Sequence, residues 1–314
     1  MSPDSHRDFF LLYLVRFAGF FFSVLNLIFM KKTFYFLLTK SIGSYINFLG
    51  VVSPNKATQM AHGYFSQPRK GKFTIDTLPK TLKEAQSETI QHNDDVIQTY
   101  IWKGNETVIF LIHGWESNSS RWKKMLPHLK KSGSTIVAID GPAQGLSSGK
   151  ELTIIKYAEY IDIVSKKYQP NYMISHSMGG MTSIYYQYKY QNPTIKKIVT
   201  LGAPSDFTII LKNFTSLLSL SNKVVKSLEK KYTEFLNTNL DLISSKEFAS
   251  KIDTKGLIVH DVEDKIVLFE EGKKIAESWK DVQFIETKGL GHKLHDDELY
   301  RKIYVFLFNP HPVQ

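Results

Sequence analysis

The stretch Tyr172-Met173-Ile174-Ser175-His176-Ser177-Met178-Gly179-Gly180 decides the fold of this chain. It begins as a short apolar run, and a segment with helical character follows directly after the glycines. Small residues at Ser175 and Gly179 let a strand and a helix approach closely at a sharp turn, where a larger side chain would clash. The stretch therefore predicts a strand that bends into a helix and holds Ser177 at the bend.

Apolar runs of the same kind lie on both sides of this stretch. Residues 108–112 form a β-branched run followed by His113-Gly114-Trp115, and residues 256–260 form another that is followed by carboxylates. A third run, residues 282–286, precedes Gly291-His292. Continuous apolar runs separated by segments of helical length are typical of buried strands in a parallel sheet.

A serine, an acidic residue and a histidine thus follow, in this order, three of the predicted strands. In this order the chain resembles the α/β-hydrolase fold family over about residues 60–308, and residues 136–147 are similar to the family's next strand and loop. The resemblance implies an α/β fold with a mostly parallel sheet and helices on both faces. It also implies a helical cap inserted after the strand that ends near Leu201.

The resemblance further assigns the catalytic roles. Ser177 is expected to be the nucleophile, His292 its base, and Asp264 the carboxylate that orients His292. The acid stays open between Asp264 and three other candidates, namely Asp261, Glu263 and Asp206. The backbone N–H groups of Trp115 and Met178 are expected to form the oxyanion hole. His113, His176 and Asp140 are interpreted as turn, packing and loop-bracing residues beside the chemistry.

Composition narrows the remaining possibilities. The chain has no cysteine, which excludes disulfides and thiolate chemistry, and no H-E-x-x-H motif, so we expect neither a metal nor a cofactor. Its 40 basic and 30 acidic residues give a formal net charge of +10, spread over lysine pairs that are typical of solvated helix faces. No nucleic-acid motif accompanies them, whereas attraction to an anionic membrane surface remains plausible.

The first part of the chain suggests contact with a membrane. Residues 9–30 are apolar and long enough for a transmembrane helix, although Arg16 interrupts them. Three interpretations stay open: a membrane span or anchor, a non-native extension before a true start at Met30, or a packing helix. Lys31 and Lys32 would leave the rest of an anchored chain in the cytoplasm. Residues 33–52 predict an amphipathic helix on the main domain or on a bilayer surface.

The expected domain organisation has four parts. An apolar segment at residues 1–30 is followed by a helical arm and linker at 31–75. The catalytic domain comprises residues 76–204 and 254–314, and the helical cap comprises residues 205–253.

These observations favour a serine hydrolase that cleaves carboxylic esters of small to medium acyl chains, including lipid-like ones, through an acyl-enzyme. The alternatives are a non-catalytic, membrane-associated binding protein on the same scaffold, and a hydrolase of thioester, amide or carbon–carbon bonds. The sequence identifies no substrate-binding residue and no oligomeric state.

Overall fold

The computed structural model describes residues 33–309, and these residues divide into two compact units. The first unit contains residues 33–61 together with Lys212–Lys230, and the second contains His62–Leu211 together with the chain from Lys231 onward. The apolar segment at residues 1–30, with its expected membrane anchor, lies outside the described residues. Within residues 33–309, no helix combines the length and the hydrophobicity that crossing a bilayer requires.

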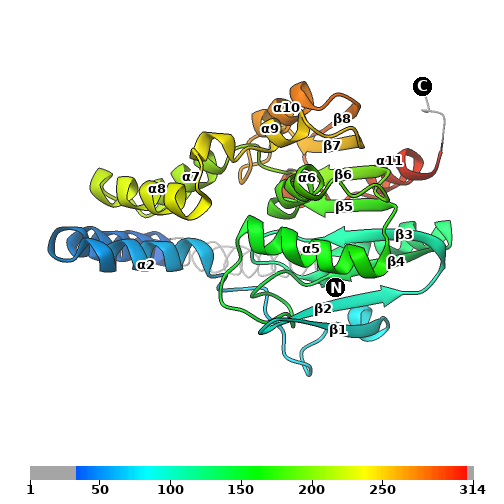
Figure 1. Cartoon of the computed structure of the whole chain (residues 1–314), viewed down its shortest axis with the longest axis horizontal. Coiled ribbons are helices and arrows are strands. Elements are labelled where there is room, and N and C mark those ends of the chain that lie inside the picture. The colour runs from blue at the N-terminus through cyan, green and yellow to red at the C-terminus, as the bar shows by residue number, and fades with distance from the viewer. Residues whose placement is uncertain (1–32, 310–314) are drawn as a thin grey trace, which may run out of the picture. The chain divides into compact units, whose positions relative to one another are not determined.

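The second unit is built on an eight-stranded sheet with the order β1-β2-β4-β3-β5-β6-β7-β8 (Figure 1). All neighbours from β4 to β8 pair in parallel, whereas β2 pairs antiparallel with both β1 and β4. The strands are β1 (Gln86–His92), β2 (Asp95–Trp102), β3 (Asn105–Ile112), β4 (Ser134–Ile139), β5 (Tyr172–His176), β6 (Lys197–Leu201), β7 (Lys255–Asp261) and β8 (Val282–Thr287).

An antiparallel hairpin forms one edge of the sheet. Strands β1 and β2 are joined by a tight turn in which Asn93 has a positive φ of 51°. Asparagine tolerates this left-handed conformation better than most residues do. The antiparallel hairpin covers the edge of β4, whereas the parallel strand β8 forms the other edge of the sheet.

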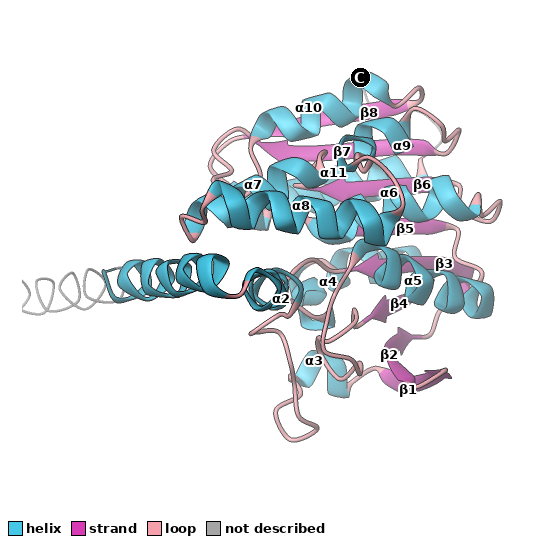
Figure 2. Ribbon diagram, turned by 60° about the vertical axis from the view of Figure 1, so that its left-hand side comes forward, coloured by secondary structure: helices cyan, strands magenta, loops and turns pink. Residues whose placement is uncertain are grey.

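Helices cover both faces of the sheet because alternate strand residues point to opposite sides (Figure 2). In β3, Phe110 and Ile112 pack on one side, while Ile109 and Leu111 pack on the other. The first side is covered by α5 (Ile154–Tyr168), α6 (Met178–Tyr190), α9 (Ser245–Ala249) and α10 (Phe269–Ser278). The second is covered by α3 (Lys80–Lys83), η1 (Ser119–Lys124), α4 (Leu126–Leu129) and α11 (Asp297–Phe308), with η2 (Lys130–Ser132) after α4. The predicted fold class is confirmed.

The long connection between β6 and β7 is helical, as the sequence predicts. It contains α7 (Phe207–Leu217), α8 (Asn222–Leu236), η3 (Leu240–Leu242) and α9. Lys212–Lys230 belong to the first unit, and the rest of the insertion belongs to the second. In the second unit, α9 packs on both α6 and α10, and its Phe248 ring contacts Tyr185 and Tyr188 of α6.

The first unit is organised around a helix at residues 33–52. Its buried face includes Gly43, Ile46 and Gly50. A Cβ on Gly43 would lie 1.6 Å from the backbone oxygen of Leu218, so this close approach requires glycine. The helix ends before Ser53-Pro54, as expected, and a further helix, α2 (Pro54–Ser66), begins at the proline. Proline suits a first helical position because its missing N–H has no partner within the helix there.

Candidate active site

Ser177 occupies the sharp turn between β5 and α6. Its φ and ψ are 55° and −127°, an unusual conformation for a residue other than glycine. Its backbone N–H donates to the carbonyl of Leu201 on the neighbouring strand β6, while its carbonyl accepts from Gly180. The strand on one side and the helix on the other therefore hold this backbone in place and leave the side chain at the turn.

Close packing at this turn explains the small residues around Ser177. A Cβ on Gly179 would lie 2.4 Å from the carbonyl oxygen of His113, a backbone atom that cannot move aside. Ser175 is fully buried, and its hydroxyl donates to the carbonyl of Val199. The predicted strand-to-helix turn, including its steric reason, agrees with the structure.

His292 lies in η4 (Gly291–Lys293), after β8, and Asp264 lies in the turn after β7. The Nε2 atom of His292 is 3.0 Å from the hydroxyl oxygen of Ser177, and its Nδ1 atom is 2.7 Å from Oδ2 of Asp264. Both distances are those of hydrogen bonds. The parallel sheet thus brings together three side chains that the sequence places after three different strands.

The environment of Asp264 favours its ionised form. Its side chain is buried, which by itself raises the pKa of the carboxyl group. Hydrogen bonds from His292 and from the backbone N–H groups of Ile266 and Val267 outweigh this effect and hold the pKa below its ordinary value. A carboxylate that stays charged beside Nδ1 can fix the tautomer of the imidazole and stabilise its protonated form.

The other candidate acids have different partners. Asp206 accepts hydrogen bonds from Ser244 and Lys274. Asp261 accepts from the Thr287 hydroxyl and from the backbone N–H groups of Glu263 and Leu290, so it braces the turns after β7 and β8. Glu263 is exposed. In the described part of the chain, none of these three carboxylates accepts a hydrogen bond from His292.

Two further histidines support the site in ways that the sequence did not indicate. The ring of His176 lies 4.8 Å from that of His292, and its Nε2 is 2.8 Å from the backbone oxygen of His292. Burial holds the pKa of His176 well below its ordinary value, so the neutral ring can donate this bond. His260, fully buried on β7, lies 3.6 Å from Asp264. In the sequence, His176 and His260 appear only as histidines at the ends of apolar runs. Such histidines are more often core residues than parts of a site.

The loops around Ser177 are held by buried polar groups. His113 accepts from the backbone N–H of Gly141 and lies within 2.8 Å of the carbonyl of Gly114. Asp140 accepts from the Tyr100 hydroxyl and from the backbone N–H of Ser119. Both residues therefore lie where the interpretation as turn and bracing residues placed them.

The backbone around Ser177 offers hydrogen-bond donors. Met178 is the first residue of α6, so its N–H lies at a helix N-terminus and has no acceptor within the helix. The turn that contains Trp115 is adjacent, because a Cβ on Gly114 would lie 2.9 Å from Cβ of Ser177. Within residues 33–309, the N–H groups of Met178 and Trp115 make no backbone or side-chain hydrogen bond.

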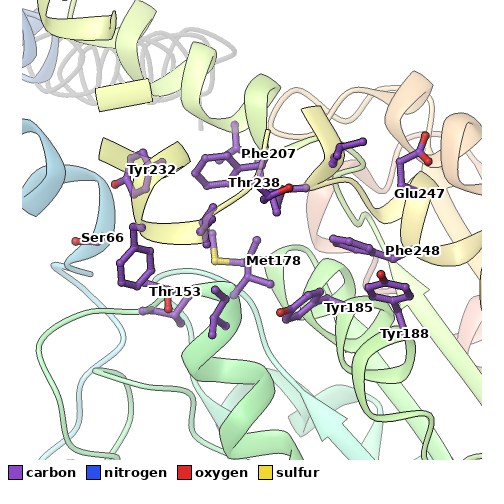
Figure 3. A pocket seen from close by; sticks show the side chains of 18 of the residues that line it. Ser66, Thr153, Met178, Tyr185, Tyr188, Phe207, Tyr232, Thr238, Glu247 and Phe248 are labelled. Atoms are coloured by element: carbon purple, nitrogen blue, oxygen red, sulfur yellow. The ribbon is translucent and has the colours of Figure 1, made fainter. Parts of the chain in front are cut away.

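An apolar pocket of about 330 Å³ lies beside Met178, within the second unit. Figure 3 shows Phe207, Tyr232 and Phe248 gathered around the Met178 side chain. Glu247 and Lys251 add charged groups to a wall that is otherwise mainly aromatic and aliphatic. Phe65 and Ser66, at the end of α2, also line the pocket, a contribution that the sequence did not reveal.

No metal site emerges from the part of the chain that the structure describes. Groups of three or more histidine, aspartate or glutamate side chains with a geometry that could hold an ion are absent from residues 33–309. Asp296 caps α11 by accepting from the N–H of Leu299, and His295 contacts the Tyr300 hydroxyl at 2.6 Å. Asp296 is therefore the N-cap of α11.

Comparison with known proteins agrees with the fold. A family model described as the alpha/beta hydrolase fold matches residues 107–241. The chain is similar to phospholipase YtpA of Bacillus subtilis, with 31% identity over 114 residues, which are 33% of this chain and 44% of that phospholipase. It therefore spans less than half of that relative.

Two further similarities extend over more of the chain. The bifunctional esterase/perhydrolase DCH of Acinetobacter calcoaceticus is 24% identical over 244 residues, covering 61% of this chain and 87% of that enzyme. Among solved structures, Est1E of Butyrivibrio proteoclasticus, with ferulic acid bound, has a TM-score of 0.56 and 17% identity, over 70% of this chain and 97% of that chain. The structural likeness shows the fold alone.

Proposed function

Because this chain belongs to the α/β-hydrolase fold family, we propose that it is a serine hydrolase that cleaves carboxylic esters through an acyl-enzyme. The observation that carries the proposal is the chain of hydrogen bonds from Ser177 through His292 to Asp264. A serine hydroxyl is a weak nucleophile unless a positioned base removes its proton during attack, and this arrangement provides that base.

The geometry supports a two-step reaction. His292 Nε2 takes the proton of Ser177 Oγ as that oxygen attacks the ester carbonyl, and the backbone N–H groups of Met178 and Trp115 stabilise the resulting oxyanion. His292 then gives the proton to the leaving alcohol oxygen, which leaves the acyl group on Ser177. Water attacks this ester in the second step, again with His292 as base. The bond between the acyl carbon and Ser177 Oγ then breaks, His292 returns the proton to that oxygen, and the carboxylic acid is released. Asp264 keeps Nδ1 protonated and stabilises the imidazolium throughout.

The pocket beside Met178 supports an acyl chain of medium length as the bound group. Its aromatic and aliphatic wall suits a hydrocarbon chain, because the transfer of apolar surface from water into an apolar site is favourable. At about 30 Å³ per water-sized group, a volume of about 330 Å³ accommodates roughly ten carbon atoms. We therefore include lipid-derived esters in the proposed substrate class.

Labelling with a fluorophosphonate tests the nucleophile. We expect the wild-type chain to be labelled at Ser177 at neutral pH, and Ser177→Ala not to be labelled. Ser183→Ala is the matched control, because this serine lies within α6, away from the turn at Ser177, and donates to the carbonyl of Gly179. Absence of labelling in the folded wild-type protein would contradict the proposal and favour a binding protein on a hydrolase scaffold.

A series of p-nitrophenyl esters tests the substrate class. We expect kcat/KM to rise from the acetate to the octanoate and to fall at the palmitate. Thr238→Phe, which fills part of the pocket, should shift the preference towards the acetate. Thr233→Phe makes the same change at an exposed position of α8 and should leave the preference unchanged. If the two variants had the same acyl-chain preference, this pocket would not be the binding site of the acyl chain.

A further inference from the structure

The helix at residues 33–52 exposes an unusual amount of apolar surface. Its large exposed side chains are between 42% and 74% accessible to solvent. Soluble monomers rarely leave so many apolar side chains together on one element, and such surfaces mark sites of association. The exposed side chains are Phe34, Tyr35, Phe36, Leu37, Leu38, Tyr45, Phe48, Val51 and Val52.

Contacts within the first unit fix which side of this helix faces outward. Lys40 donates to the carbonyl of Leu217 and to the Ser219 hydroxyl. Asn47 donates to the carbonyl of Ser219 and accepts from the N–H of Ser221. These polar contacts, with the buried glycines, hold one face of the helix against residues 217–224.

The opposite face is an apolar stripe. Tyr45, Phe48 and Val52 are spaced by three and four residues, so their side chains follow one another along the same side of the helix. Their exposed fractions are 53%, 61% and 60%. A rotation of the helix would not bury them without breaking the hydrogen bonds of Lys40 and Asn47.

The charge of the first unit indicates what this stripe contacts. Residues 33–61 and 212–230 contain six lysines and a single acidic residue, Glu229. Apolar and aromatic side chains combined with an excess of lysine are typical of helices that lie at the surface of an anionic bilayer. A second copy of the chain would bring its lysines close to those of the first, which disfavours self-association. The lysines are Lys40, Lys56, Lys212, Lys223, Lys226 and Lys230.

We propose that the stripe of Tyr45, Phe48 and Val52 docks the first unit onto the surface of an anionic lipid bilayer. The helix lies in the plane of the interface, with its apolar side chains among the headgroups and upper acyl chains, and the lysines of the unit attract the acidic headgroups. In the sequence, the apolar residues 9–30 precede this helix, which agrees with a bilayer as the partner. This docking does not depend on the proposed hydrolysis.

The chain offers a clean way to test this proposal, since it contains no cysteine. A single cysteine can be introduced in the full-length protein by Phe48→Cys and labelled with an environment-sensitive nitrobenzoxadiazole dye. Lys280→Cys, in the second unit and with a side chain that is 82% exposed, is the matched control. Each protein is mixed with vesicles of phosphatidylcholine alone or of phosphatidylcholine and phosphatidylglycerol.

We expect the dye at position 48 to brighten and shift to the blue with the anionic vesicles, and nitroxide-labelled lipids to quench it. The dye at position 280 should not respond. Lys223→Gln combined with Lys226→Gln should weaken the response of the position 48 dye about tenfold or more, since each surface lysine contributes to attraction by acidic lipids.

Three results would overturn the proposal. The protein could float with the vesicles while the dye at position 48 stays unchanged, which would place the attachment elsewhere in the chain. The dye could be blue-shifted without vesicles and respond to dilution, which would identify a second copy as the occupant. It could also be blue-shifted at every dilution without vesicles, which would show that another part of the same chain covers the stripe.

Discussion

Two regions of the molecule differ in which side chains they expose to solvent. One is the set of strand ends around Ser177, and the other is the helix at residues 33–52. At the strand ends, Asp264 is buried and has defined hydrogen-bond partners. On the helix, apolar side chains such as Phe48 remain exposed although neighbouring residues fix the orientation of the helix. Burial makes electrostatic interactions strong enough for chemistry, whereas fixed apolar exposure indicates binding to another surface. The two regions should therefore respond to different perturbations.

The largest effect is expected at the strand ends. Ser177→Ala and His292→Ala should each lower kcat by roughly 10⁴-fold or more, and the double variant should be no worse than either single one, because these side chains act as a unit. Steady-state and single-turnover kinetics with a p-nitrophenyl ester measure this. If the two losses multiplied, the residues would not belong to one catalytic group.

The choice between two carboxylates sharpens the description of this region. Asp264→Asn should lower kcat by about 10⁴-fold, because an amide cannot stabilise the imidazolium in the same way. The asparagine oxygen can still accept from Ile266 and Val267, so the fold should persist. Asp206→Asn should leave kcat within a few-fold, since this residue binds Ser244 and Lys274 instead. A harsher effect at Asp206 would show that the acid has been misassigned.

A change on the helix should alter binding and local stability but not turnover. Gly43→Ala places a methyl group against the backbone of Leu218, and overpacking of this kind costs about 1–3 kcal/mol. Hydrogen exchange should become faster in residues 33–61 and 212–230, while hydrolysis of a water-soluble ester stays within a few-fold. Gly63→Ala is the control, because its Cβ would meet only the side chain of Gln67 at 3.8 Å. Equal effects of the two substitutions would argue against the packing described for Gly43.

The smallest effect is a difference in pH dependence. Burial, reinforced by the charges of Arg121, Lys124 and Lys293, lowers the pKa of His295 from 6.5 to about 4. Between these values the unfolded chain binds the proton and the folded chain does not, so the stability that His295 contributes above pH 6.5 is lost as the pH falls towards 4.

Urea denaturation across this pH window checks the effect. The wild-type protein should lose more stability on acidification than His295→Gln, which carries no titrating ring. Residues 33–61 contain no aspartate, glutamate or histidine, so hydrogen-exchange protection factors, which remove the intrinsic pH dependence of exchange, should change less there than at residues 291–308. An identical pH slope in the two proteins would rule out His295 as the source.

The sequence by itself determined the elements of the fold and the order of the site. Apolar runs of strand length predicted β3, β5, β7 and β8, the family resemblance indicated β4 and β6, and steric need at Gly179 predicted the turn at Ser177. Such features depend on neighbours within a few residues, because the periods of strand and helix and the space at a turn are local properties. A local property also predicted the end of the helix at residues 33–52, because Ser53-Pro54 follows it directly.

Only the tertiary structure decided which groups meet. Asp206, Asp261 and Asp264 all follow strands and look alike in sequence, yet only the order and register of β6, β7 and β8 place Asp264 beside His292. The contact of His176 with His292 joins residues 116 positions apart, and the pocket near Met178 combines α2, α5, α6 and the insertion. Nor could the amphipathic pattern of residues 33–52 tell which side of the helix is buried, since apolar residues occur both on the buried side, at Ile46, and on the exposed side, at Phe48. Contacts with residues 217–224, which are distant in the sequence, determine which side is buried. No local sequence pattern specifies such contacts.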